Sequence, residues 1–180
     1  VGLGVGKKKG TPNPNPNRQS ISLLCVARLS PEKGVDVLLD AIKDLPDVSL
    51  DVIGDGQSEH DLKQIAKPLG ERVRFLGRRN DVRSLYANYD ALVLPSREHD
   101  PFGLVAAEAM MAGIPVIVTD ACGIADYMTN GNDALVTRAG NADSLKRAIN
   151  LLTERETKDR IAREGKKTAE EQFSAKRMVD

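Results

Sequence analysis

The chain alternates between two hydrophobic patterns from residue 21 onward. Short runs of apolar residues predict buried strands at 21–28, 49–54, 72–77, 90–96, 114–120 and 133–137. Between the strands, apolar residues recur at helical spacing and predict amphipathic helices at 34–45, 58–69, 81–89 and 98–110, before a charged helical segment at 153–173. Strands that alternate with helices predict an α/β fold with a doubly wound, mostly parallel sheet covered by helices on both faces.

The first twenty residues differ from the rest because they consist largely of Gly, Lys and Asn-Pro repeats. This composition predicts a linker or flexible tail at 1–20, followed by one domain at 21–180. The segment GLGVGKKKG is not a phosphate-binding loop by its pattern, because the glycine spacing is one residue short and no strand precedes it.

The charge balance excludes several partners, since 26 Lys and Arg residues balance 26 Asp and Glu residues. Without a basic excess we expect neither nucleic acid binding nor electrostatic attachment to a membrane. No apolar run approaches the ~20 residues of a membrane span, and no signal-peptide pattern is present, which predicts a cytoplasmic protein. The two cysteines, Cys25 and Cys122, lack metal-ligand spacing and are expected to be packing residues.

Two loops of the predicted sheet contain candidate binding residues. In the common doubly wound order, strands one and four are neighbours, and ligands bind beyond their carboxyl ends. The loop after strand one places Arg28 at the strand end and Lys33 near the next helix, so both cations are expected on one rim. Taken alone, they could be solvated surface charges, which is the usual role of single charged residues. The same loop also has the residues of a helix start, with Ser30 as the cap and Pro31 in the first turn.

The loop after strand four, EHDPFGLVAAEAM, predicts a helix that begins with Asp100 as N-cap and Pro101 in the first turn. Gly103 in that first turn would let a ligand approach the backbone, and free N–H groups at a helix start bind anions. With the two cations opposite, phosphate is the expected anion. Glu108 lies eight residues after Asp100, which on one helix would place it about 12 Å further along the axis. This arrangement suits an elongated nucleotide-sugar.

Four segments resemble the C-terminal, donor-binding domain of the group 1 retaining glycosyltransferases, which have the GT-B fold. They are VARLSPEKGVDVLL, GDGQSEHDL, VRFLGRRNDVRSLYANYDALVLPS and DPFGLVAAEAMMAGIPVIVTDACG, and the resemblance extends from Ile21 through Leu135 to the C-terminal helices. The resemblance implies a Rossmann-like domain that binds a nucleotide-sugar, with UDP or GDP as the nucleotide. It implies no cofactor beyond that donor.

The resemblance also implies roles for individual residues. Arg28 and Lys33 would hold the donor diphosphate, together with the backbone amides of Phe102, Gly103 and Leu104. The second glutamate of the family's pair matches Glu108, which would bind the ribose. The first matches Asp100, where the family has the glutamate that meets the transferred sugar, so the choice of sugar is in question here. Weaker matches, to be weighed against plain turn and surface roles, place the base near Gly54, Gly56 and Arg78.

Family enzymes have a second domain that binds the acceptor, and only a tail precedes the first strand here. The resemblance therefore implies half of a two-domain enzyme of carbohydrate biosynthesis, which binds its donor alone but does not turn it over. Any attachment to a membrane would come through the missing N-terminal domain. No Asp-x-Asp pair occurs in the sequence, so no metal is expected to bridge the diphosphate.

Two other classes of protein share parts of this pattern. A dinucleotide-binding oxidoreductase has the same architecture, but RLSPEKG follows strand one instead of Gly-x-Gly-x-x-Gly. A non-catalytic nucleotide-sugar-binding module would keep the donor residues without transfer. The identity of any upstream domain would distinguish this module from a transferase.

Overall fold

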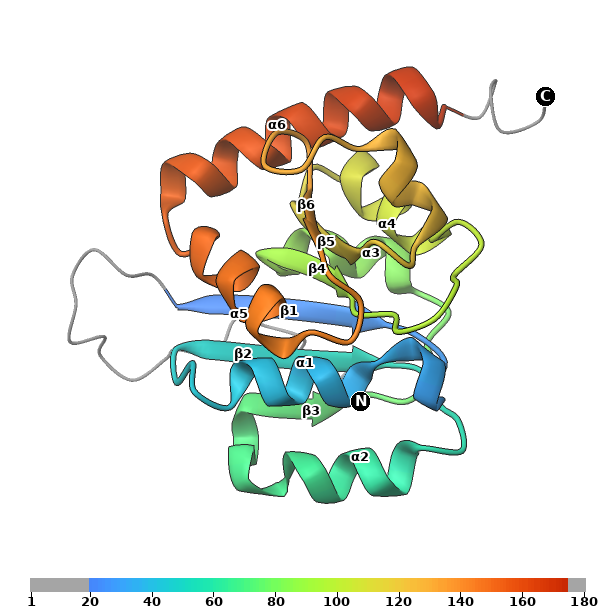
Figure 1. Ribbon diagram of the computed structural model, residues 1–180, viewed down its shortest axis with the longest axis vertical. Coiled ribbons are helices and arrows are strands. Elements are labelled where there is room, and N and C mark those ends of the chain that lie inside the picture. The colour runs from blue at the N-terminus through green and yellow to red at the C-terminus, as the bar shows by residue number, and fades with distance from the viewer. Residues whose placement is uncertain (1–19, 175–180) are drawn as a thin grey trace.

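The computed structural model describes residues 20–174, which form a parallel sheet between two layers of helices (Figure 1). The strands are β1 (Ile21–Val26), β2 (Val48–Ile53), β3 (Val73–Phe75), β4 (Ala91–Leu94), β5 (Val116–Thr119) and β6 (Leu135–Thr137). The α-helices are α1 (Val35–Ile42), α2 (Glu59–Ala66), α3 (Val82–Leu85), α4 (Leu104–Met111), α5 (Ala142–Leu151) and α6 (Arg155–Gln172). Short 3-10 helices are η1 (Pro31–Lys33), η2 (Lys67–Arg72), η3 (Tyr86–Asn88) and η4 (Gly123–Tyr127).

The order of the strands confirms the doubly wound prediction. The six strands lie in the order β3-β2-β1-β4-β5-β6, and every neighbouring pair is parallel. β1 and β4 are neighbours, with Leu23 opposite Ala91 and Leu24 opposite Leu92. The chain winds outward in both directions from this pair, so the loops after β1 and β4 meet at the topological switch point.

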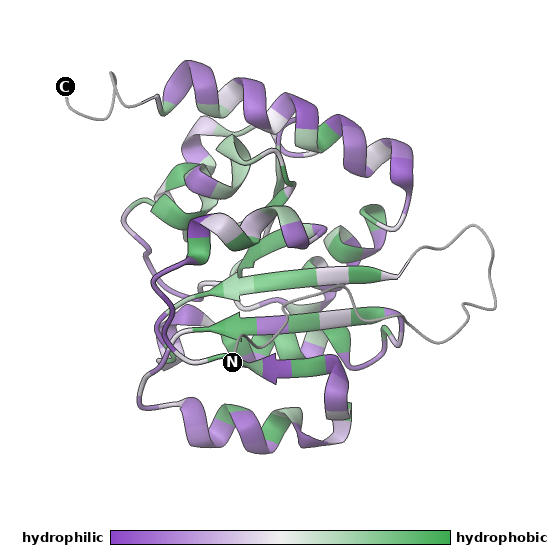
Figure 2. Cartoon of the chain, turned by 180° about the vertical axis from the view of Figure 1, so that it is seen from behind, coloured by the Kyte–Doolittle hydropathy of each residue, from purple (hydrophilic) through white to green (hydrophobic). Residues whose placement is uncertain are grey.

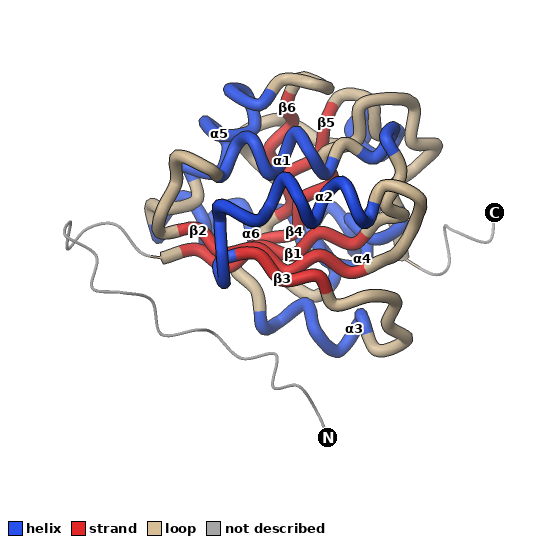
Figure 3. The backbone as a smooth tube through the Cα atoms, turned by 90° about the horizontal axis from the view of Figure 1, so that it is seen from below, coloured by secondary structure: helices blue, strands red, loops and turns tan. Residues whose placement is uncertain are grey.

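Helices cover both faces of the sheet, as the alternating pattern predicts. Residues of α1, α2 and α5 pack in one hydrophobic core, and residues of α3 and α4 pack in another on the opposite face. The long helix α6 contributes to both, with Ile161 in the first core and Ala169 in the second. Figure 3 shows α1, α2 and α5 on one side of the strands and α3 on the other. In Figure 2 the strands are mostly hydrophobic, whereas the long helix α6 is largely hydrophilic.

Both cysteines are packing residues, as predicted, because Cys25 and Cys122 are free thiols buried in the two cores. Burial raises the pKa of Cys25 to about 12. The charged segment predicted at 153–173 forms α6, and a separate helix, α5, which the sequence pattern did not predict, lies between β6 and α6. None of the helices in residues 20–174 is both long enough and apolar enough to span a membrane. The predicted tail at 1–20 lies almost entirely outside the described residues.

Asp90, just before β4, joins the sheet to α6. Its carboxylate accepts hydrogen bonds from Ser22 N at 2.9 Å, Ser22 Oγ at 3.0 Å and Lys158 Nζ at 3.1 Å. Burial opposes ionisation of Asp90, but these hydrogen bonds outweigh it and hold the pKa of Asp90 below its ordinary value. A lowered folded-state pKa stabilises the fold above the unfolded-state pKa, and that contribution disappears as pH falls through the folded-state pKa.

We therefore expect Asp90→Asn to lower the melting temperature at neutral pH and to have a shrinking effect as the pH approaches about 2. Thermal melts across this pH range would measure the difference between the variant and the wild type. Asp126→Asn is the matched control, since Asp126 is exposed and has no hydrogen-bond or ion-pair partner among the described residues. An Asp90→Asn difference that does not change with pH would contradict this account.

Candidate functional site

A cavity of about 740 Å³ opens at the carboxyl ends of β1, β2 and β4. Its position agrees with the prediction that the ligand lies beyond strands one and four. Most of the predicted site residues line it, namely Arg28, Lys33, Gly54, Gly56, Arg78, Asp100, Gly103 and Leu104. Phe102 and Glu108 are not among the lining residues.

Backbone contacts fix the loops around the cavity. The N–H of Arg97, after β4, donates to the carbonyl of Glu32 at 2.8 Å, and its guanidinium pairs with Asp36 at 2.7 Å. On the other side, a Cβ at Gly54 would lie 1.9 Å from the carbonyl oxygen of Ala27, so no larger residue fits there. Gly54 therefore has a packing role whether or not a base binds beside it.

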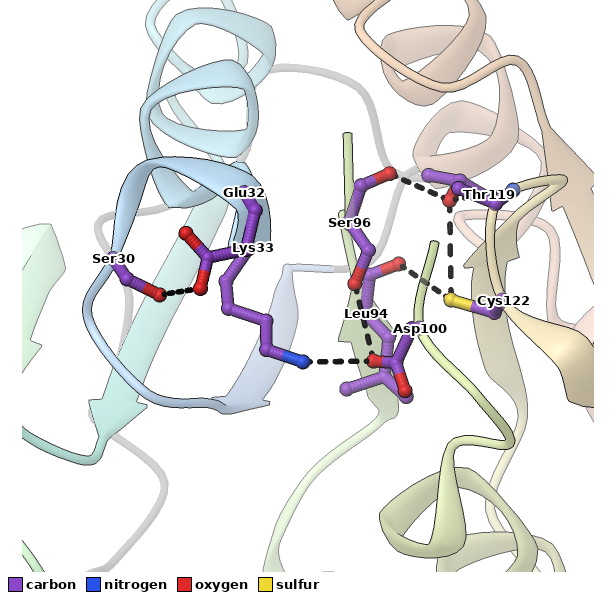
Figure 4. Close-up of polar contacts among 9 residues, drawn as sticks. Ser30, Glu32, Lys33, Leu94, Ser96, Asp100, Thr119 and Cys122 are labelled. Carbon is purple, nitrogen blue, oxygen red and sulfur yellow. Dashed lines mark hydrogen bonds and ion pairs between the residues drawn. The ribbon is translucent and has the colours of Figure 1, made fainter. Parts of the chain in front are cut away.

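The predicted cations around the cavity differ in whether they already have a partner in the protein. Within residues 20–174, the guanidinium groups of Arg28 and Arg78 make no hydrogen bond or ion pair, and both residues are exposed. Lys33 Nζ instead lies 3.2 Å from Oδ2 of Asp100, where their side chains are 27% and 16% exposed (Figure 4). An anionic ligand would meet Arg28 directly and would share Lys33 with the Asp100 carboxylate.

Asp100 is not the helix cap that the sequence suggests, and this prediction is wrong. α4 begins at Leu104, with Gly103 as its N-cap, and the carboxylate of Asp100 accepts from Lys33 and, at 3.3 Å, from Ser96 Oγ. The Asp-Pro-Phe-Gly segment is drawn out of the helix because the backbone of Asp100 pairs with the chain near Cys122. Asp100 is thereby available to a ligand in the cavity.

The free N–H groups predicted at this helix start lie further along the chain than expected, because α4 begins at Leu104. Gly103 has φ of 93°, a left-handed conformation that glycine adopts readily. Among the described residues, the backbone N–H groups of Gly103, Leu104 and Val105 donate to no protein acceptor. They lie at the positive end of α4, where free N–H groups favour an anion.

The loop after β1 also differs from the expected helix start. Pro31 does occupy the first position of η1, but Ser30 makes no capping hydrogen bond. Its Oγ donates to Glu32 Oε1 at 2.6 Å instead, as Figure 4 shows. This hydrogen bond lowers the pKa of Glu32. The short helix η1 nonetheless places Lys33 at the cavity, as predicted.

Glu108 lies in α4, beside the cavity rather than in its lining. Because α4 starts at Leu104, Glu108 is four helical residues from the helix start, and the predicted eight-residue separation from Asp100 along one helix is wrong. Its carboxylate accepts from Tyr86 OH at 2.8 Å and from Arg83 Nη2 at 3.0 Å. Leu104, one turn earlier on α4, and Val82, next to Arg83, both line the cavity.

The sequence pattern did not indicate the residues that hold the two carboxylates. Ser96, Arg83 and Tyr86 lie 4, 25 and 22 residues from their carboxylate partners. His60 and His99 are exposed and line no part of the cavity. Within residues 20–174, no group of three or more His, Cys, Asp or Glu side chains could hold a metal ion.

Comparisons with known sequences point to one family. The family model described as "Glycosyl transferases group 1" matches residues 7–168. The lipopolysaccharide core biosynthesis glycosyltransferase LpsE of Rhizobium meliloti is 33% identical over 161 residues, which are 88% of this chain and 47% of LpsE. The sulfoquinovosyl transferase of Arabidopsis thaliana is 30% identical over 151 residues, which are 81% of this chain and 29% of that protein. The chain thus spans less than half the length of these relatives.

Solved structures share the fold. Crystal structures of Anabaena HepE with UDP and glucose and with UDP-glucose give TM-scores of 0.80 and 0.79 at 31% and 32% identity. They cover 88% and 86% of this chain and 45% of HepE. The C-terminal domain of the group 1 glycosyl transferase LpcC from Francisella tularensis gives a TM-score of 0.79 at 21% identity over 88% of both chains, which shows the likeness of fold alone.

Proposed function

The chain belongs to the group 1 glycosyltransferases, and from this we propose that it is the donor-binding domain of a retaining enzyme that transfers a sugar from a nucleoside diphosphate. The domain comprises residues 21–180. A second domain supplies the acceptor site, in keeping with relatives of about twice this length. Alone, the donor domain binds its nucleotide-sugar without transferring the sugar.

One observation carries this proposal, which is the convergence of positive groups in the cavity at the switch point. Arg28, Lys33 and the free N–H groups at the start of α4 lie around one cavity of about 740 Å³. A diphosphate is the anion that suits two cations and a helix start together. These groups bind the diphosphate, and Glu108 beyond them binds the ribose.

The same groups assist the reaction. When the bond between the sugar and the diphosphate breaks, negative charge grows on the departing phosphate oxygen. Fixed cations and backbone dipoles aimed at that oxygen stabilise the transition state more than the bound substrate. Asp100, held by Lys33 and Ser96, accepts a hydrogen bond from a sugar hydroxyl. In this proposal the protein's own cations stabilise the charge on the departing phosphate, so the reaction does not require a metal ion.

The donor nucleotide is UDP in this proposal, with GDP as the alternative. HepE from Anabaena, 31% identical to this chain, has structures with UDP and with UDP-glucose. Arg78 and the loop of Gly54 and Gly56 form the wall of the cavity nearest β2 and β3, where the base binds. The exposed Arg78 guanidinium is then available to the base or ribose rather than to the protein.

NMR titration of the purified protein with UDP tests this assignment. We expect amide shifts to cluster at residues 28–34 and 100–108, with a binding isotherm that saturates. Parallel titrations with GDP and ADP rank the nucleotides. Shifts spread over α5 and α6, or no saturable change with any of the three nucleotides, would contradict the proposal. Donor binding without transfer, after this chain is joined to an acceptor-binding domain, would instead indicate a non-catalytic binding module.

A further inference from the structure

The two oxygens of the Glu108 carboxylate have partners of opposite character. Tyr86 OH donates to Oε2 at 2.8 Å, and Tyr86 is a core residue that is 1% exposed. Arg83 donates to Oε1 through Nη2 at 3.0 Å and Nε at 3.3 Å, and its side chain is 82% exposed. One oxygen is therefore held from inside the protein and the other from the solvent side.

Arg83 occupies the exposed side of the Glu108 carboxylate. Nε and Nη2 belong to one guanidinium and both donate to Oε1, so they approach this oxygen from one side. Oε2 is held by the buried hydroxyl of Tyr86, so the open approach to the carboxylate is the side that Arg83 covers. A ribose hydroxyl that bonds to Oε1 from that side displaces at least one donor of Arg83.

Resting on the proposed donor function, we propose that the ribose of the donor replaces Arg83 on Oε1 of Glu108, while Tyr86 is the positioning residue that keeps Oε2 in place. Arg83 is thus a competitor of the nucleotide, although it is a cation beside a site for an anionic ligand. The location supports the exchange, because Val82 and Leu104, which flank this contact, both line the cavity.

Displacing Arg83 from the Glu108 carboxylate costs less free energy than displacing Tyr86. An exposed ion pair contributes little net free energy, since water replaces each partner well. Tyr86 cannot be replaced in this way because it lies in the core between α3 and α4. Burial first, and then its hydrogen bond to Glu108, raise the pKa of Tyr86, so its hydroxyl remains a proton donor at neutral pH.

The exchange predicts that substitutions at Arg83 and Tyr86 change the affinity for UDP in opposite directions. Calorimetric titration of the purified protein with UDP measures both changes. Arg83→Ala should bind UDP about two- to fivefold more tightly, because the ribose no longer displaces an ion pair. Tyr86→Phe should bind UDP about three- to tenfold more weakly, because Glu108 loses the hydrogen bond that orients it. If Arg83 instead served only as a positive charge that attracts the diphosphate, Arg83→Ala would weaken UDP binding.

A second ligand separates the exchange from general electrostatics and from folding. With 2′,3′-dideoxy-UDP, which lacks the ribose hydroxyls, both variants should bind as the wild type does. Tyr89→Phe is the matched control for Tyr86→Phe, since Tyr89 OH donates to Asp51 at 2.7 Å in the same buried manner but away from the cavity. Arg155→Ala is the control for Arg83→Ala, because its side chain is 76% exposed on α6.

The outcomes distinguish this inference from the proposed function. Tighter UDP binding in Arg83→Ala, weaker binding in Tyr86→Phe and wild-type binding in both controls would support the exchange. Equal or weaker UDP binding in Arg83→Ala, while the wild type binds UDP well, would overturn the exchange and leave the donor function intact. Failure of the wild type to bind UDP, GDP or ADP would overturn both.

Discussion

Lys33→Ala should weaken UDP binding by about ten- to a hundredfold, and by more than Arg28→Ala. A charge-assisted contact with phosphate is worth about 1.5–3 kcal/mol, and both variants lose such a contact. Lys33→Ala has a second cost because Lys33 neutralises Asp100 across 3.2 Å. Without Lys33, an uncompensated carboxylate faces the incoming diphosphate in a partly buried cavity, where charges are screened less than at the surface.

Calorimetric titration with UDP measures both losses. The double variant Lys33→Ala, Asp100→Asn should regain part of the affinity that Lys33→Ala loses, because it also removes the repelling charge. Arg138→Ala is the matched control, since Arg138 is an exposed residue in the loop after β6 that does not line the cavity. Wild-type affinity in Lys33→Ala would remove Lys33 from the site, and a double variant weaker than Lys33→Ala would refute the repulsion.

The fold could be predicted from the sequence because its evidence is periodic and repeated. Each strand is a short buried run between helical patterns, so an error at one segment does not change the α/β class. The adjacency of β1 and β4 follows from the common doubly wound order, and it brought Arg28 and Lys33 to the cavity as predicted. Residues at strand ends are placed by the backbone alone.

Contacts that depend on the tertiary structure were not predictable in this way. Asp100-Pro101 has the local chemistry of a helix start, but a backbone bridge to Cys122 competes with it, and α4 begins at Leu104 instead, with Gly103 as its N-cap. Local preference for a cap is worth only about 1 kcal/mol and yields to several backbone hydrogen bonds. The pairing of Arg83 and Tyr86 with Glu108 joins distant segments through side-chain directions, for which the sequence has no periodic signal.

The position of Asp100 changes what its substitution should do. As a helix cap, Asp100 would tolerate asparagine because both side chains accept the capping hydrogen bond. In the structure it is instead the acceptor of Lys33 and Ser96, through Oδ2 alone, and no described residue donates a hydrogen bond to Oδ1. In the complex that we propose, Oδ1 is therefore the oxygen that accepts from the sugar. Asp is one methylene shorter than the Glu that the family resemblance implies at this position, about 1.5 Å less reach, so in that complex the sugar would lie closer to the loop or be bridged by water.

In the two-domain enzyme that we propose, Asp100→Asn should lower the rate of sugar transfer about tenfold or more, because a neutral amide cannot strengthen its hydrogen bond as charge develops in the transition state. UDP affinity should stay the same or rise, since Lys33 is released from its carboxylate partner. The melting temperature should fall little, as the ion pair is partly exposed. Transfer kinetics, UDP titration and thermal melts on the same preparation separate these effects. Asp100→Glu should keep the fold and shift the preference among UDP-sugars. Wild-type transfer by Asp100→Asn would show that Asp100 serves the loop structure and not the sugar.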